Sequence, residues 1–144
     1  MSAQFHGLTS IGLILLAVAI ALALAFQTSW LLGAGYLAAG LLSLVAIVYA
    51  FCAKCPCQAH CGHVLPGKLA ARFTSRRPGP YTRVELAAVV VAGILLLGLP
   101  QLWLWPHTWL FVAFWLLIAL ALIQIRAYVC RACDNRYCPA HTAR

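Results

Sequence analysis

Residues 28–55, TSWLLGAGYLAAGLLSLVAIVYAFCAKC, join a long apolar run to a pair of cysteines. The apolar part, residues 30–52, contains no Asp, Glu, Lys or Arg. A helix needs about 20 such residues to cross the roughly 30 Å of hydrocarbon in a bilayer. Three other stretches, 8–26, 84–105 and 108–129, have a similar length and apolar character. The sequence therefore predicts four membrane-spanning helices.

The composition of the whole chain supports the same interpretation. The chain has 144 residues, of which 65% are hydrophobic and only 8% are charged. So few polar side chains cannot cover the surface of a water-soluble globule. We expect an all-α membrane protein in which the four helices form two tandem hairpins.

The basic residues predict the orientation of the hairpins. All ten lie on one side of the expected membrane, and the short connections at 27–29 and 106–107 contain none. Basic residues favour the cytoplasmic side of a membrane protein. We therefore expect a multi-pass protein of the cell inner membrane, with both termini and the 53–83 loop in the cytoplasm. The basic residues are Lys54, Lys68, Arg72, Arg76, Arg77, Arg83, Arg126, Arg131, Arg136 and Arg144.

The seven cysteines form two groups, and each group follows a predicted hairpin on the cytoplasmic side. The groups are Cys52, Cys55, Cys57 and Cys61, and Cys130, Cys133 and Cys138. Cytoplasmic thiols are normally kept reduced, so the pattern favours metal ligation over structural disulfides. Thiol–disulfide catalysis is less favoured, because Cys52 and Cys130 follow helix C-termini, where the helix dipole disfavours a thiolate.

The two halves of the chain are similar in sequence. TSWLL at 28–32 matches HTWLF at 107–111 with an offset of 79 residues. FCAKC at 51–55 matches VCRAC at 129–133 with an offset of 78 residues. An even number of crossings separates the two halves, so both would have the same orientation in the membrane. This pattern is typical of a parallel internal repeat.

The repeat predicts how the chain is divided. Residues 1–63 and 83–144 each form a hairpin followed by a Cys/His metal knuckle, and residues 64–82 form a basic interfacial loop. The expected ligands are Cys52, Cys55, Cys61 and His63 in the first knuckle, and Cys130, Cys133, Cys138 and His141 in the second.

Zinc is the metal that these ligands favour. Structural zinc takes four thiolate or imidazole ligands, and a Cys-x-x-Cys turn aims two sulfurs at one ion. Each half would bind one of two zinc ions, or the two Cys-x-x-Cys pairs would share one ion. Cys57 remains as an additional ligand. An iron–sulfur cluster is the alternative, because the first group is as dense as a ferredoxin loop and Cys138 precedes a proline, as the last cysteine of a ferredoxin often does.

The loop between the hairpins contains an amphipathic segment. Leu65, Leu69 and Phe73 fall on one helical stripe. An adjoining basic stripe consists of Lys68, Arg72 and Arg76. We expect a short helix in the membrane interface with its cations toward anionic lipid headgroups, or alternatively toward an acidic protein. No nucleic-acid recognition motif accompanies the charge, so nucleic acid is not an expected partner.

Small and polar residues in the spans predict close packing between helices. We expect close contact along an alanine stripe in the first span and along Gly35 and Ala39, or Ala34 and Ala38, in the second. We also expect hydrogen bonds between helices from Tyr36, Ser43 and Gln124. Four tryptophans should lie at the interface opposite the cysteines. The alanines are Ala17, Ala21 and Ala25, and the tryptophans are Trp30, Trp103, Trp105 and Trp109.

The expected function is non-catalytic. Residues 8–51 and 86–122 contain no Asp, Glu, Lys or Arg, so the spans lack the ionisable groups that transporters use along a path. The sequence favours an accessory or scaffold subunit of a larger membrane complex, with other membrane proteins as partners. The alternatives are an iron–sulfur electron-transfer subunit and a metal sensor or metallochaperone that uses Cys57.

Overall fold

The structure is a computed structural model that describes residues 3–55, 61, 64–75, 79–133, 135, 137 and 138. All secondary structure in these residues is helical. The helices are α1 (Ala3–Thr28), α2 (Trp30–Ala50), η1 (Cys52–Lys54), α3 (Val64–Phe73), α4 (Arg83–Gly93), η3 (Ile94–Gly98), α5 (Gln101–Leu104), α6 (Thr108–Gln124), η4 (Ile125–Val129) and η5 (Cys130–Ala132).

Four continuous helical stretches in the described residues are long and apolar enough to cross a membrane. These stretches are Ala3–Thr28, Trp30–Lys54, Arg83–Leu104 and Thr108–Ala132. They confirm the four spans that the apolar runs predict, and the protein is a multi-pass membrane protein.

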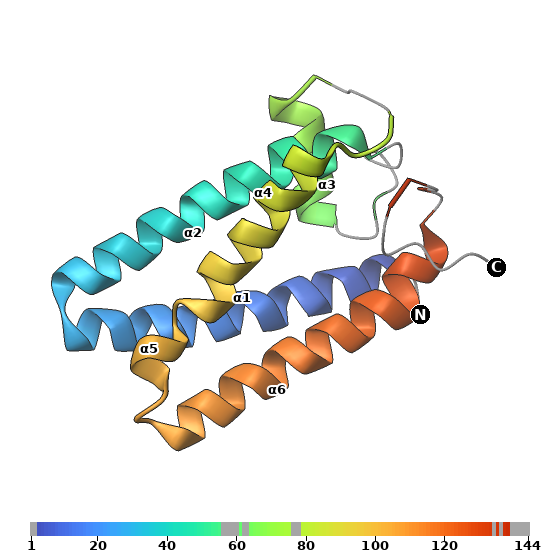
Figure 1. Cartoon of the computed structure of the whole chain (residues 1–144). Coiled ribbons are helices and arrows are strands. Elements are labelled where there is room, and N and C mark those ends of the chain that lie inside the picture. The colour runs from blue at the N-terminus through green and yellow to red at the C-terminus, as the bar shows by residue number, and fades with distance from the viewer. Residues whose placement is uncertain are drawn as a thin grey trace.

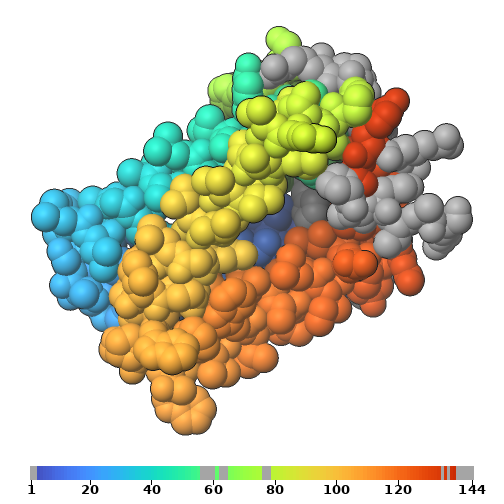
Figure 2. Space-filling view, viewed as in Figure 1, coloured from blue at the N-terminus to red at the C-terminus, as the bar shows by residue number. Residues whose placement is uncertain are grey.

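The spans form two antiparallel hairpins that share one orientation (Figure 1). The turns of both hairpins lie at one end of the molecule, and the start of α1 and the end of the fourth span lie at the other. α1 contacts both α2 and α6, whereas α4 contacts α2. In Figure 2, α1 is visible between α4 and α6. The third span therefore crosses the molecule from α2 toward α6, and α5 contacts α1 and α6.

The alanine stripe of α1 is buried as predicted. Ala17, Ala21 and Ala25 are all fully buried, because α1 is covered by α2 on one side and α6 on another. The prediction for α2 is wrong in detail, since Gly35 is exposed and Gly33 is the buried glycine. A Cβ atom on Gly33 would collide with the ring of Phe26 in α1. Glycine is thus needed at position 33, two residues before the one that the sequence pattern indicated.

The third span is interrupted before Pro100, at the π-helical segment η3. In a continuous α-helix the carbonyl of Leu96 would accept a bond from the N–H of residue 100, which proline lacks. The hydroxyl of Tyr36 donates to this carbonyl instead, at 2.9 Å. The side chain of Gln101 donates to the carbonyl of Leu97 at 2.6 Å. Side chains therefore satisfy the carbonyls that the break exposes, which is how membrane helices tolerate proline.

The hydrogen bond from Tyr36 confirms one of the three predicted polar contacts between helices. Within the described residues, the buried Ser43 Oγ and Gln124 Oε1 have no hydrogen-bond partner. The prediction is therefore wrong for the Ser43 hydroxyl, which bonds to no other helix in the described part of the chain. Whether a buried polar group has a hydrogen-bond partner depends on the atoms around it, which residue type alone does not specify.

One tryptophan has a different role from the one predicted. Trp30, Trp105 and Trp109 are strongly exposed near the hairpin turns, as an interfacial position requires. Trp103 is 6% exposed, and its indole N–H donates to the carbonyl of Ala21 at 2.9 Å. Its ring also contacts the ring of Tyr36 edge-on. Trp103 is therefore a core residue that joins α5 to the first hairpin.

Candidate metal centre

The two Cys-x-x-Cys segments fold in the same way. Each begins at the end of a spanning helix and forms a single 3₁₀ turn, η1 in the first half and η5 in the second. The N–H of the second cysteine donates to the carbonyl of the first, at 3.2 Å for Cys55 and Cys52 and at 3.3 Å for Cys133 and Cys130. In both turns the second cysteine has an extended backbone. The two Cys-x-x-Cys segments, 78 residues apart in sequence, thus have the same backbone conformation.

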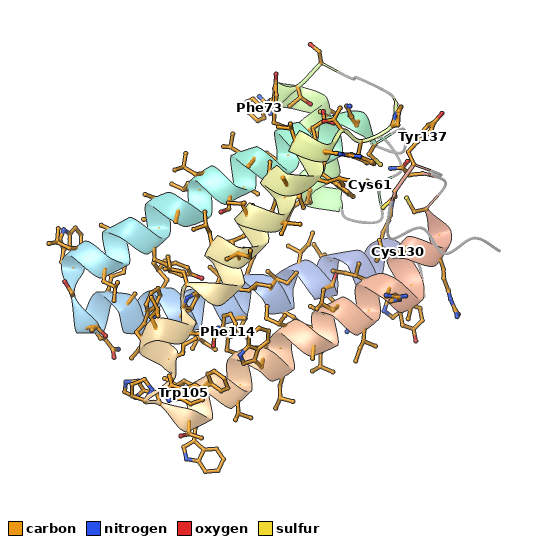
Figure 3. All side chains as sticks on the ribbon, in the orientation of Figure 1. Cys61, Phe73, Trp105, Phe114, Cys130 and Tyr137 are labelled. Carbon is orange, nitrogen blue, oxygen red and sulfur yellow. The ribbon has the colours of Figure 1, made fainter. Side chains whose placement is uncertain are left out.

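The cysteines of both groups lie at the same end of the molecule, opposite the hairpin turns (Figure 3). Within the first group, Cys52 interacts electrostatically with Cys61. Within the second, Cys130 interacts electrostatically with Cys138 and Cys133. Each of these cysteines is half-buried. The last cysteine of each group, Cys61 or Cys138, therefore lies near the first cysteine of its Cys-x-x-Cys turn.

Tyr81 connects the two groups. Its ring stacks on Phe51, the residue before Cys52, with 4.7 Å between ring centroids and 16° between planes. Its hydroxyl donates to the Phe51 carbonyl at 3.4 Å. The same hydroxyl accepts a bond from Asn135 Nδ2 at 2.9 Å. Asn135 lies between Cys133 and Cys138 in sequence, so one phenol contacts both cysteine segments.

The surroundings of the Tyr81 phenol include thiols from both halves of the chain. Burial is the main cause that raises the pKa of Tyr81 above its usual value. Cys55, Cys138 and Cys52 raise the pKa further by electrostatic interaction, while the bond from Asn135 lowers it. The phenol is therefore neutral at physiological pH, which lets it donate one hydrogen bond and accept another.

Asn135 also shapes the second cysteine segment. Its side chain is 1% exposed, and its Oδ1 accepts a bond from the N–H of Tyr137 at 3.1 Å. Its carbonyl accepts a bond from the N–H of Cys138 at 3.2 Å. Asparagine commonly makes such local turns. Asn135 therefore brings Cys138 back toward η5 while its amide N–H₂ reaches Tyr81.

Lys54 links the first cysteine turn to the start of α4 through an ion pair. It lies between Cys52 and Cys55 in sequence, and its ammonium group is 2.7 Å from the carboxylate of Glu85. The ammonium also donates to the carbonyl of Pro80 at 2.9 Å. Glu85 is at the same time part of a capping box with Thr82 at the start of α4. The carboxylate thus caps α4 and holds η1 beside residues 80–85.

Three of the nine predicted ligands, Cys57, His63 and His141, lie outside the described residues. Among the residues that the structure describes, no group of three or more His, Cys, Asp or Glu side chains is placed to hold a metal ion. The six described cysteines still gather in two groups that Tyr81 joins. Lys68 and Arg72 are exposed on α3, and Arg76 lies outside the described residues.

Tyr81 and Asn135 were not among the predicted site residues. The available sequence signal was their position, since Asn135 follows Cys133 by two residues and Tyr81 follows the helix-breaking PGP of residues 78–80. Neither position specifies that the side chains meet, because 54 residues separate them. Comparison of the chain with protein-family models, with curated proteins and with solved structures finds no match.

Proposed function

We propose that this protein is a non-catalytic scaffold subunit of a larger membrane complex, and that its cysteine end binds two structural zinc ions. The spans support a scaffold role, because residues 8–51 and 86–122 contain no Asp, Glu, Lys or Arg. Pumps and carriers use such groups inside the membrane. Two packed hairpins that carry polar, cysteine-rich segments at one end are suited to holding partner subunits together.

The matching turns η1 and η5 are the observation that carries the zinc proposal. Both carry two half-buried cysteines on a 3₁₀ turn, and the second cysteine of each has an extended backbone. A tight turn of this length lets two sulfurs bind one tetrahedral ion. Each half then completes its own site, with Cys61 and His63 in the first and Cys138 and His141 in the second. In this proposal residues 1–63 and 83–144 are repeats, and residues 64–82 connect them.

Two bound ions would give the cysteine end the stability that its local packing lacks. η1 and η5 are only three residues long, and neither forms an apolar core of its own. A structural zinc ion contributes on the order of 10 kcal/mol to the folding of an isolated small knuckle. The Tyr81 contacts then align two separately folded knuckles rather than supplying ligands.

We further propose that the cysteine end faces the cytoplasm of a cell with an inner membrane. All ten lysines and arginines flank the cysteine ends of the spans or follow them. The reducing cytoplasm keeps thiols available for zinc. Partner subunits would contact the exposed apolar faces of the spans and the polar surface around the knuckles.

Elemental analysis of the purified full-length chain tests the zinc proposal. We expect a colourless protein with about two zinc ions per chain, and about one after Cys133→Ala, because each knuckle holds its own ion. Cys57→Ala is the matched control and should retain about two. About one zinc ion in the unmodified chain, and none after Cys133→Ala, would indicate a single shared site.

Three results would each overturn part of the proposal. A brown protein that contains iron and absorbs near roughly 400 nm would instead be an iron–sulfur electron-transfer subunit. Weak, exchangeable metal that is lost in Cys57→Ala would indicate a metal sensor or metallochaperone. Purification as a monodisperse single chain with no retained partner from its native membrane would contradict the subunit role.

A further inference from the structure

An apolar groove lies between α2 and α3. Its volume is about 230 Å³. α2 supplies one wall and α3 the other, and the lining residues are Leu44, Val45, Val48, Tyr49, Leu69, Phe73 and Thr74. Phe73 is 72% exposed, and Val45 is also largely exposed. Side chains of this kind in a groove require an apolar occupant.

Two cations stand at the edge of this groove. Lys68 and Arg72 are exposed and lie one helical turn apart on α3, next to the groove residues Leu69 and Phe73. The guanidinium of Arg72 is 5.9 Å from the centre of the Phe73 ring. In the described part of the chain the carboxylate available for pairing is Glu85, and it is bound to Lys54. The rim of the groove is therefore positively charged.

The groove lies at a depth where lipid chains meet their headgroups. Its α2 residues, 44–49, precede the end of the second span at Lys54 by five to ten residues. A rise of 1.5 Å per residue puts them about 8 to 15 Å from that end. Figure 1 shows α3 across the end of α2 rather than alongside it. Apolar walls thus face the acyl region while the cations of α3 face the headgroup region.

We propose that this groove binds one anionic phospholipid of the surrounding bilayer. An acyl chain lies against Val45, Leu69 and Phe73, and the phosphate is held by Lys68 and Arg72. Charge complementarity selects an anionic lipid over a zwitterionic one, whose headgroup carries its own cation. A second copy of this chain is a poor occupant, because a symmetric contact would bring the cations of both copies together.

Native mass spectrometry of the full chain in detergent tests the proposal, with phosphatidylglycerol and phosphatidylcholine of identical acyl chains as probes. We expect phosphatidylglycerol to be retained at least tenfold more strongly. The double variant Lys68→Gln/Arg72→Gln should lose this preference. Arg83→Gln/Arg126→Gln removes the same charge from two exposed residues outside the groove and is the matched control. Equal retention of the two lipids by the unmodified chain would overturn the proposal.

A second pair of variants tests the groove separately from the cations. Val45→Phe fills the groove and should reduce retention of phosphatidylglycerol several-fold, whereas Val91→Phe, at an exposed position on α4, should not. Helical content by circular dichroism identifies any variant that fails to fold. Unchanged retention in Val45→Phe would overturn acyl binding in the groove, and preferential capture of an acidic polypeptide through Lys68 and Arg72 would show that the occupant is a protein. None of these outcomes depends on metal content.

Discussion

At the scale of single residues, the hydroxyl of Tyr81 is the contact on which the arrangement of the cysteine end depends. It bonds to Phe51 in the first half of the chain and to Asn135 in the second. Because Asn135 is buried, its amide has no access to water if the phenol is removed. A buried donor without an acceptor costs about 1–3 kcal/mol.

Tyr81→Phe should therefore loosen the second cysteine segment. The substitution keeps the ring that stacks on Phe51 and removes the acceptor of Asn135. We expect amide hydrogen exchange at Tyr137 and Cys138 to accelerate about tenfold, which corresponds to roughly 1.4 kcal/mol. Tyr137→Phe is the control, because that side chain is 59% exposed and the substitution leaves Asn135 bonded to Tyr81. Equal exchange rates in the two variants would contradict the role of Tyr81.

At the scale of secondary-structure elements, the α1–α2 hairpin depends on one close approach. The ring of Phe26 on α1 occupies the position where a side chain on Gly33 would lie. The space beside Gly35, two residues further along α2, is open. Small residues that allow such close backbone contact are the main source of helix packing in membranes, where no hydrophobic effect drives helices together.

Gly33→Ala should destabilise the hairpin, and Gly35→Ala should not. The added methyl group at Gly33 forces the Phe26 ring to move, and overpacking of this kind typically costs about 1–3 kcal/mol. Unfolding in a denaturing detergent, followed by tryptophan fluorescence, measures the difference between the two variants. A Gly33→Ala protein as stable as the Gly35→Ala protein would show that α1 and α2 pack differently.

The break in the third span is a second feature at this scale. Pro100 removes the N–H that would bond to the Leu96 carbonyl, and the Tyr36 hydroxyl replaces it from α2. α2 is therefore linked to α4–α5 through a hydrogen bond that exists because the third helix is interrupted. Such a bond between membrane helices is worth about 1 kcal/mol.

A double-mutant cycle tests this account of the break. Tyr36→Phe should cost about 1 kcal/mol in the natural sequence, because the Leu96 carbonyl then has no donor. In a Pro100→Ala background the restored N–H replaces the tyrosine, so the same change should cost close to nothing. Denaturation of the four proteins in mixed micelles gives the coupling energy. A coupling energy of zero would mean that Tyr36 and Pro100 act independently.

At the scale of the whole molecule, the hairpin turns and the cysteines occupy opposite ends. Our proposal puts the turns outside the cell and the cysteines inside, following the distribution of basic residues. Ser29 lies between α1 and α2, and Ser75 follows α3 at the opposite end; both are exposed. They provide two reporter positions of the same residue type.

Labelling with a membrane-impermeant maleimide tests the orientation. Ser29→Cys should react in intact spheroplasts, whereas Ser75→Cys should react only after the membrane is permeabilised, as should the native cysteines. The reverse pattern would put the cysteines on the oxidising side of the membrane. That result would remove the chemical argument for zinc, because exposed thiols there tend to form disulfides.

The sequence predicted features that depend on composition along a single helix. The four spans follow from length and hydropathy because lipid requires every backbone group to be bonded within the helix. The buried stripe of Ala17, Ala21 and Ala25 follows from the four-residue spacing of these alanines. The sequence did not predict that Gly35 is exposed or that Trp103 is buried. Which side of a helix faces the core depends on how the helix is rotated about its own axis, and the neighbouring helices set that rotation.

The candidate site likewise has features that the sequence predicted and features that only the structure shows. The residue types and the two-residue spacing of Cys52 and Cys55, and of Cys130 and Cys133, indicated paired thiols, and the structure gives both pairs one turn geometry. The connection through Tyr81 and Asn135 depends on two loops that meet across 54 residues. Loop positions of this kind are determined by where the helix ends lie, and residue spacing within a loop carries no information about them.

The sequence by itself determined that this protein crosses the membrane four times and that its cysteines follow the second and fourth spans. Both properties depend on the free energy of transferring each segment into lipid, which is local to the segment. The tertiary structure alone decided that α1 lies between α2 and α6, that α4 rests on α2, and that Tyr81 joins the two cysteine groups. These arrangements depend on shape complementarity between segments distant in the chain. Apolar helices in lipid are stabilised by close packing against one another rather than by burial away from water.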